Sequence, residues 1–156
     1  MQLKLLPKPE PADALMRTLV ATHAACDHMS QVAWDSRTFR TFALQKRCYH
    51  AVRETCGLAA QMVIRALAKV GDAYTLDTTT KRTFRPTSAM AYADRLLSFA
   101  LPDSSISIWT RDTRQSFPFV CGTHQRALLP FPRGESDRAC VRGSWSLFAT
   151  VPVGRS

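Results

Sequence analysis

The sequence of 156 residues lacks the patterns that mark several large classes of protein. No stretch approaches the roughly 20 apolar residues of a membrane-spanning helix. The N-terminus has no basic segment followed by a hydrophobic one, as a secretion signal would. No internal repeat, low-complexity tract, phosphate-binding loop, nucleophile elbow or paired-histidine metal motif is present. These absences favour a soluble, cytoplasmic protein that has no membrane partner and no catalytic residues of its own.

Cysteine is present but forms no recognisable pattern. The five cysteines are odd in number and include no CxxC pair: Cys26, Cys48, Cys56, Cys121 and Cys140. This arrangement predicts neither a disulfide framework nor a zinc ribbon. Cys121, His124 and Cys140 lack a fourth ligand for a tetrahedral zinc site. We therefore expect reduced thiols, no metal and no other cofactor.

Acidic residues are scarce: 12 stand against 21 lysines and arginines, for a net charge of +9. The excess is concentrated in residues 37–85, which hold ten basic and three acidic side chains. A concentrated positive field with aromatic rings among the cations suits a polyanion, and nucleic acid is the commonest polyanion in a cytoplasm. A surface made basic only for solubility explains the total charge better than it explains the clustering.

The first half predicts one strand and three helices. Residues 2–6 alternate weakly and end at Pro7, which suits a short strand. One helix is expected from the proline-rich segment 9–11 to about residue 35, and a second over 42–55 with Thr41 as its N-cap. Gly57 is a plausible break before a third helix that ends at residue 74. Two inward faces are expected: Leu15, Leu19, Cys26, Met29 and Ala33, then Leu44, Cys48, Ala51 and Val52.

From residue 89 the apolar period becomes two. Strands are predicted at 97–100, 105–109, 114–120 and 144–151, with turns at 110–113 and 142–143 and a short helical segment within 122–129. The predicted fold is α+β, with a three-helix bundle inserted after the first strand of a small antiparallel β-barrel. Residues 1–8 and 84–156 would form the barrel, and residues 9–83 the bundle.

The third predicted helix carries a narrow polar stripe on an otherwise apolar surface. Its members recur every three or four positions: Gln61, Arg65, Lys69 and Asp72. Asp72 is spaced to neutralise only Lys69, so Arg65 needs another anionic partner. A solvated face with one intrahelical ion pair is the alternative.

The second predicted helix mixes rings with cations. Phe42, Lys46, Tyr49 and Arg53 share one face, a composition that grips phosphates and stacks on bases. The alternative is an aromatic pair tucked against the neighbouring helix.

Two non-helical segments add further cations. Lys81, Arg82 and Arg85 surround Phe84 in a segment that Pro86 keeps out of a helix, and Arg37 and Arg40 stand in the link before the second helix. From their charge, these five residues are expected to follow phosphates. A solvated linker is the alternative for the loop.

Short motifs follow one another along nearly the whole chain. They are LKLLP at 3–7 with PEP at 9–11, AAC at 24–26 with VAW at 32–34, GLAAQ at 57–61 with Ala66, Lys69, Val70, Ala73 and Tyr74, FRP at 84–86, SIW at 107–109, PFVCG at 118–122 and RGESD at 133–137. In this order and spacing the chain resembles the N-terminal half of the TnpB family. These are the RNA-guided endonucleases of insertion sequences, related to type V CRISPR effectors.

The resemblance implies a wedge-type, OB-like barrel and a helical recognition bundle, which together hold guide RNA and read a short DNA motif beside the target. Gln61 stands where family members place a glutamine that contacts bases of this motif, and its amide suits an adenine edge. Phe42 stands where an aromatic residue is frequent, and Lys46 where a polar contact is made.

The chain also departs from the family pattern. It lacks the segment that supplies the first metal-binding aspartate of a RuvC nuclease, and the zinc-binding cysteine pairs are absent. Asp27 replaces a common asparagine, and residues 140–146 differ from the expected lysine- and tyrosine-rich hairpin. The expectation is a truncated or split TnpB-like transposase accessory protein. It would bind guide RNA or DNA without cleaving it, with a separately encoded RuvC-containing half as a further partner. The alternative is an unrelated small basic adaptor that binds a protein.

Overall fold

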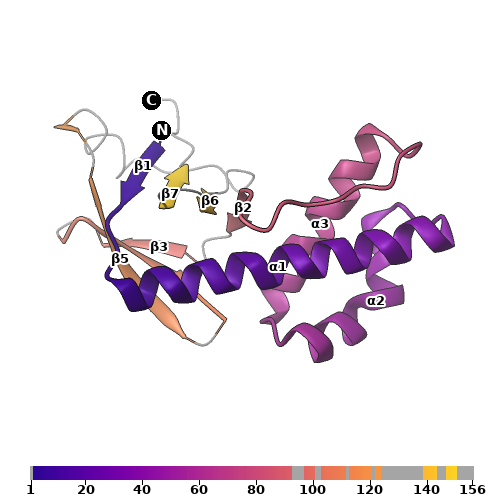
Figure 1. Cartoon of the computed structure of the whole chain (residues 1–156), viewed down its shortest axis with the longest axis horizontal. Helices are drawn as coiled ribbons and strands as arrows, with labels where there is room; N and C mark the ends of the chain where they lie inside the picture. The colour runs from indigo at the N-terminus through magenta and orange to yellow at the C-terminus, as the bar shows by residue number, and fades with distance from the viewer. Residues whose placement is uncertain are drawn as a thin grey trace. The chain divides into compact units, whose positions relative to one another are not determined.

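The structure is a computed structural model that describes residues 2–92, 97–100, 103–111, 113–120, 122–123, 139–143 and 147–150. Three helices follow the first strand, so the predicted α+β class and the place of the helices are confirmed. The elements are β1 (Gln2–Leu5), α1 (Pro9–Ser36), α2 (Thr41–Cys56), α3 (Ala60–Leu76), β2 (Met90–Tyr92), β3 (Leu97–Ala100), β4 (Ser105–Trp109), β5 (Arg114–Val120), β6 (Ala139–Gly143) and β7 (Leu147–Thr150) (Figure 1).

The chain forms two compact units. Met1–Met16 and Ala89–Ser156 form one, which we call the strand unit, and Arg17–Ser88 form the other, which we call the helical unit. The boundary falls inside α1, so one continuous helix belongs to both units. The domain limits expected from the sequence, 1–8 with 84–156 and 9–83, stay a prediction.

The strand unit is an antiparallel sheet with the order β2-β6-β7-β1-β5-β4-β3. β1 lies in its middle, where Leu5 pairs with Phe119 of β5 and Leu3 pairs with Ala149 of β7. In the part of the chain that the structure describes, β2 and β3 form the two edges and do not pair with each other. The sheet is open there, and the predicted closure into a barrel is not seen.

Side chains alternate across the sheet as the sequence predicts. Ile106 of β4 lies opposite Phe117 of β5, and both are fully buried, while the neighbouring pair Ser107 and Ser116 lies on the wetter face. The alternation of β4 therefore reflects one packed and one solvated face. Phe117 is joined by Phe119, whose ring meets the edge of Phe99 at 6.2 Å.

The second half of the chain differs in part from its predicted elements. The turn predicted at 142–143 is wrong, because both residues belong to β6 and pair with Phe148 and Leu147 of β7. Cross-strand pairing outweighs the poor strand propensity of Gly143. β2 was not expected from the sequence. Of the helical segment predicted within 122–129, residues 124–129 lie outside the described residues, as do parts of the predicted strand 144–151.

The helical unit is packed around apolar faces of its three helices. The predicted inward face of α1 is confirmed, since all five of its apolar residues are buried. In α2, Leu44, Cys48 and Val52 are buried as predicted, but Ala51 is exposed. The buried residues of α2 repeat every four positions, which leaves Ala51 off the buried stripe.

The ends of α2 show how the helices are separated. Arg40, not Thr41, is the N-cap: its backbone is extended, and its carbonyl accepts a hydrogen bond from Leu44 N at 2.9 Å. Thr41 is the first helical residue, so its predicted capping role is wrong. Gly57 ends the helix with a φ of 62°, where its N–H donates to Arg53 O. This left-handed position favours glycine, and it confirms the break before α3.

Cys26 of α1 lies in the core of the helical unit. Its thiol is fully buried and points at the carbonyl of Ala66 on α3, with 3.8 Å between sulfur and oxygen. Burial raises the pKa of the Cys26 thiol from 9.0 to about 12, and the nearby charge of Lys69 offsets only part of that increase.

The reactivity of Cys26 should therefore be very low in the native protein. A pKa raised by about three units lowers the thiolate fraction at pH 8 roughly a thousandfold. With iodoacetamide at pH 8, we expect site-resolved mass spectrometry to find half-buried Cys56 alkylated and Cys26 unmodified until urea unfolds the chain. Equal alkylation rates for Cys26 and Cys56 in the native protein would contradict this packing.

Candidate functional site

The eleven residues expected to bind nucleic acid all lie in the helical unit. Seven are exposed: Arg37, Arg40, Phe42, Lys46, Arg53, Lys81 and Arg85. Four are half-buried: Tyr49, Gln61, Arg65 and Arg82. The structure divides them among α2, the link before α2, the loop after α3, and α3 itself.

The basic aromatic face of α2 consists of Phe42, Lys46, Tyr49 and Arg53. Phe42 is 70% exposed, and the Lys46 Nζ lies 4.7 Å from the centre of its ring. Tyr49 meets the neighbouring His50 ring edge-on at 5.3 Å. Because Phe42 stays in water, it is not tucked against a neighbouring helix, and the stabilisation of about 1.5–3 kcal/mol from burying such a ring is not gained.

A hollow of about 400 Å³ lies on this face of α2. Phe42, Gln45, Lys46, Tyr49 and His50 line it, so three of the four residues predicted to share a face do meet there. Gln45 and His50 were not singled out from the sequence. They stand three and eight residues after Phe42, which places them on the same helix face. This spacing in the sequence could have predicted that they join the hollow.

The cations of α2 and of the link before it form no ion pairs within the described residues. Arg40, Lys46, Arg47 and Arg53 are exposed, and none forms an ion pair with a residue that the structure describes. Glu54 is the single acidic residue in the sequence of α2. The positive field of this surface is therefore not neutralised within the described part of the chain.

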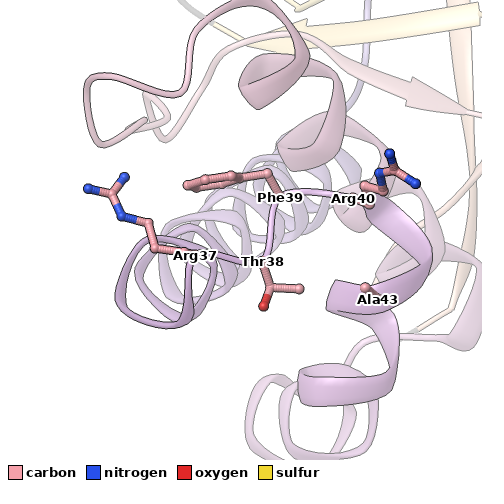
Figure 2. A pocket seen from close by; sticks show the side chains of 5 residues that line it. All are labelled: Arg37, Thr38, Phe39, Arg40 and Ala43. Atoms are coloured by element: carbon pink, nitrogen blue, oxygen red, sulfur yellow. The ribbon is translucent and has the colours of Figure 1, made fainter.

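A second hollow, of about 380 Å³, lies at the link between α1 and α2 and is lined by Arg37, Thr38, Phe39, Arg40 and Ala43. Figure 2 shows the guanidinium groups of Arg37 and Arg40 at opposite ends of this segment, with the Phe39 ring between them. The two arginines thus present charge on either side of one aromatic ring.

Arg37 is fixed, whereas Arg40 extends into solvent. Arg37 directly follows α1 with a φ of 52°, and its guanidinium carbon lies 4.3 Å from the centre of the Trp34 ring. The Phe39 ring packs against Tyr74 of α3, with 4.8 Å between ring centres. The Arg40 side chain makes no hydrogen bond or ion pair within the described ranges. It is the arginine of this hollow that is available to a ligand.

The loop after α3 runs back alongside α1 (Figure 1). Both backbone groups of Arg82 are held: its carbonyl accepts from Ser30 Oγ at 2.5 Å, and its N–H donates to Tyr74 Oη at 3.2 Å. Phe84 N donates to Asp27 Oδ1 at 2.8 Å, and Lys81 Nζ donates to Gln31 Oε1. The loop is non-helical as predicted, and its backbone is anchored to α1 rather than left as a solvated linker.

The three cations of the loop differ in availability. Arg82 pairs with Asp77 at 3.7 Å, and hydrogen bonds from the hydroxyl and N–H of Thr79 lower the pKa of the Asp77 carboxyl. Lys81 is engaged by Gln31. Arg85 is exposed and forms no ion pair among the described residues. Arg85 is therefore the most accessible charge of the loop.

Lys69 of the α3 stripe turns toward α1 instead of toward Asp72. Its Nζ donates to His23 Nε2 at 2.7 Å and to Ser88 Oγ at 3.0 Å. His23 Nδ1 lies 2.7 Å from the carbonyl of Leu19, so it donates there and leaves Nε2 as an acceptor. Asp72 stays exposed and forms no ion pair with Lys69, so a half-buried polar cluster takes the place of the alternative, a solvated face with one intrahelical ion pair.

Gln61 and Arg65 lie in the first turns of α3 and are half-buried, so neither is sealed in the core. Neither lines the α2 hollow or the link hollow. The structure thus does not join the α3 stripe to the two hollows into one site.

Among the described residues, no group of three or more His, Cys, Asp and Glu side chains could hold a metal ion. None of the described helices is long and apolar enough to cross a membrane. No family model and no curated protein sequence matches the chain.

Proposed function

We propose that this chain binds nucleic acid through its helical unit and does not cut it. The proposal is carried by one observation: Arg40, Lys46, Arg47 and Arg53 are exposed along α2 and its N-terminal link, unpaired within the described part of the chain and interleaved with an exposed ring. Lysine and arginine supply phosphate contacts, and those contacts provide most of the affinity for a nucleic acid.

The resemblance to TnpB proteins supports a narrower form of the proposal. In this form the chain is a cytoplasmic TnpB-like element whose strands belong to a wedge-type barrel, and whose ligands are guide RNA and target-adjacent DNA. Gln61 would then read a base beside the target, and a separately encoded RuvC-containing half would supply cleavage. Gln61 lies at the start of α3 and is half-buried, so it is not sealed in the core.

The test is binding at several salt concentrations. We expect the full chain to bind a labelled 20-nucleotide RNA or a 20-base-pair DNA in fluorescence anisotropy. Its affinity should fall about 50- to 150-fold between 50 and 200 mM salt if four phosphates are contacted. An affinity that does not change with salt concentration would contradict the proposal and favour a protein-binding adaptor.

A pair of matched variants locates the site. Arg40→Gln with Arg53→Gln should weaken binding and lower the salt slope by about two, because two phosphate contacts are lost. Lys4→Gln with Lys8→Gln removes the same charge from exposed positions of the strand unit and should change the slope little. Equal losses in both variants would show that net charge, not this surface, determines binding.

A further inference from the structure

We propose that the α2 hollow stacks unpaired bases, so that the preferred ligand of this surface is single-stranded nucleic acid. The inference rests on the proposed function and specifies its substrate class. It is carried by the two rings of the hollow and by the groups that surround them, and not by the charge of the surface alone.

Phe42 is the first stacking ring. It is 70% exposed, and its partner in the described part of the structure is the ammonium group of Lys46, 4.7 Å from the ring centre. A lysine held at a ring face places a phosphate-binding group next to a base-binding one. A nucleotide needs a cation beside an aromatic ring in this way, because its phosphate and its base are adjacent.

Tyr49 is the second ring and lies two turns further along the helix. Seven residues at 1.5 Å per residue separate the two positions by about 10.5 Å along the axis. That distance is about three times the 3.4 Å between stacked bases, so the rings do not sandwich one base and would serve different nucleotides of one strand. The T-shaped contact of Tyr49 with His50 helps to hold its ring in place.

The rest of the hollow supplies polar contacts. Gln45 offers an amide that both donates and accepts, which fits the edge of an unpaired base. The volume of about 400 Å³ falls in the range of pockets that hold small ligands. The hollow thus combines ring faces, an amide and a cation, the groups that contact bases and phosphates of a single strand.

This geometry favours single strands over duplexes. In a duplex each base face is already covered by its neighbours, and turning a base outward costs unstacking and unpairing energy. An unpaired base offers its face without that cost. Aromatic side chains in proteins that bind single strands stack on bases in this way and tolerate any sequence.

The experiment uses the full chain and three fluorescent probes of equal length: oligo-dT, oligo-U and an oligomer of abasic sites. The abasic probe keeps the phosphates and removes the bases. We expect the two base-containing probes to bind at least tenfold more tightly than the abasic one. A hairpin duplex of the same charge should bind more weakly than oligo-dT.

Variants then assign the effect to the ring. Phe42→Ala should weaken oligo-dT binding roughly 5- to 150-fold, the equivalent of about 1–3 kcal/mol of stacking, and leave abasic binding unchanged. Phe42→Tyr should retain the affinity. Leu76→Ala is the matched control, since Leu76 is an 83% exposed apolar residue at the end of α3. Circular dichroism confirms that each variant is folded.

Two results would overturn the inference while the proposed function stands: equal salt-dependent affinity for abasic and base-containing probes, or equal loss for both in Phe42→Ala. Tighter binding of the duplex than of oligo-dT would likewise overturn it. The absence of any salt-dependent binding would overturn both proposals.

Discussion

Replacing Gly71 with alanine is expected to destabilise the helical unit by about 1–3 kcal/mol. Gly71 lies in the middle of α3 and is buried where α3 meets the first residue of α2. A Cβ at this position would overlap Thr41 Oγ1 and approach Thr41 Cβ to 3.2 Å. The hydroxyl sits on a short β-branched side chain, so relief requires a rotamer change or a shift of the helix backbone.

Helix propensity alone predicts the opposite sign. Alanine in a helix interior is about 1 kcal/mol more favourable than glycine, so a position without steric restriction would gain stability from this change. Urea unfolding followed by circular dichroism gives the difference in the free energy of unfolding. A stabilised Gly71→Ala variant would mean that the two helices do not approach as closely as described.

Thr41→Ala provides the control, because it removes the overlapping hydroxyl and keeps the residue helical. We expect Gly71→Ala in this background to cost at least 1 kcal/mol less than in the natural sequence, a coupling typical of residues in direct contact. The remaining cost reflects the 3.2 Å approach of the two Cβ atoms. Ala68→Gly, a half-buried position on the same helix, measures the propensity term separately.

The close approach at Gly71 connects the core to the candidate site. Thr41 directly follows Arg40 and precedes Phe42, so the glycine sets how near the start of α2 lies to α3. A larger residue would displace the two side chains on which the proposed phosphate and base contacts depend. Measuring oligo-dT affinity in Gly71→Ala therefore tests whether the position of the α2 N-terminus matters for binding.

The helices could be predicted because their information is local. The apolar residues of α1 recur at helical spacing over the whole buried face, and that periodicity determines which side faces the core. Gly57 likewise marks the end of α2 by its own conformational freedom. The cap of α2 was misassigned because residue type favours Thr41, whereas the backbone becomes extended one residue earlier, at Arg40.

The partners of Lys69 could not be predicted, because they come from distant parts of the sequence. His23 and Ser88 lie 46 and 19 residues from Lys69, whereas Asp72 is three residues away. A sequence pattern can pair Lys69 only with a nearby carboxylate such as that of Asp72. Tertiary packing instead brings the His23 imidazole and the Ser88 hydroxyl to Lys69. The same limit applies to β2, which is short and is defined by its pairing with β6.

The exposed surface of α2 could be predicted only in part from the sequence. Its shared face follows from helical spacing, so Phe42, Lys46 and Tyr49 could be grouped from the sequence. Their exposure could not, since the same spacing suits an aromatic pair packed on a neighbouring helix. Exposure depends on the direction in which Leu44, Cys48 and Val52 orient the helix when they are buried.

Replacing Tyr74 with phenylalanine is expected to release the basic loop after α3 and to lower the free energy of unfolding by about 1–3 kcal/mol. The Tyr74 hydroxyl is almost completely buried, and it joins α3 to both α1 and the loop. It lies 2.8 Å from Ser30 Oγ and accepts a hydrogen bond from the backbone N–H of Arg82. Without it, the N–H of Arg82 loses its acceptor in a half-buried position.

Trypsin reports this release directly, because the loop contains Lys81 and Arg82, and trypsin cleaves the peptide bond after each of them. In the natural chain the two hydrogen bonds to the Arg82 backbone hold these peptide bonds in place, and cleavage requires local opening. We expect Tyr74→Phe to be cleaved in the loop roughly ten times faster or more. Ser30→Ala, which removes the donor to the Arg82 carbonyl, should behave similarly.

Tyr49→Phe is the matched control, since it removes a hydroxyl from half-buried Tyr49 on α2, well separated in sequence from the loop. It should leave both the unfolding free energy and the loop cleavage rate unchanged. The double variant of Tyr74→Phe with Ser30→Ala should cost less than the sum of the single changes, because both remove the same network. Strict additivity would show that the two hydroxyls act independently of each other. Natural resistance to trypsin in Tyr74→Phe would show that the contacts of Lys81 and Phe84 with α1 are sufficient to hold the loop.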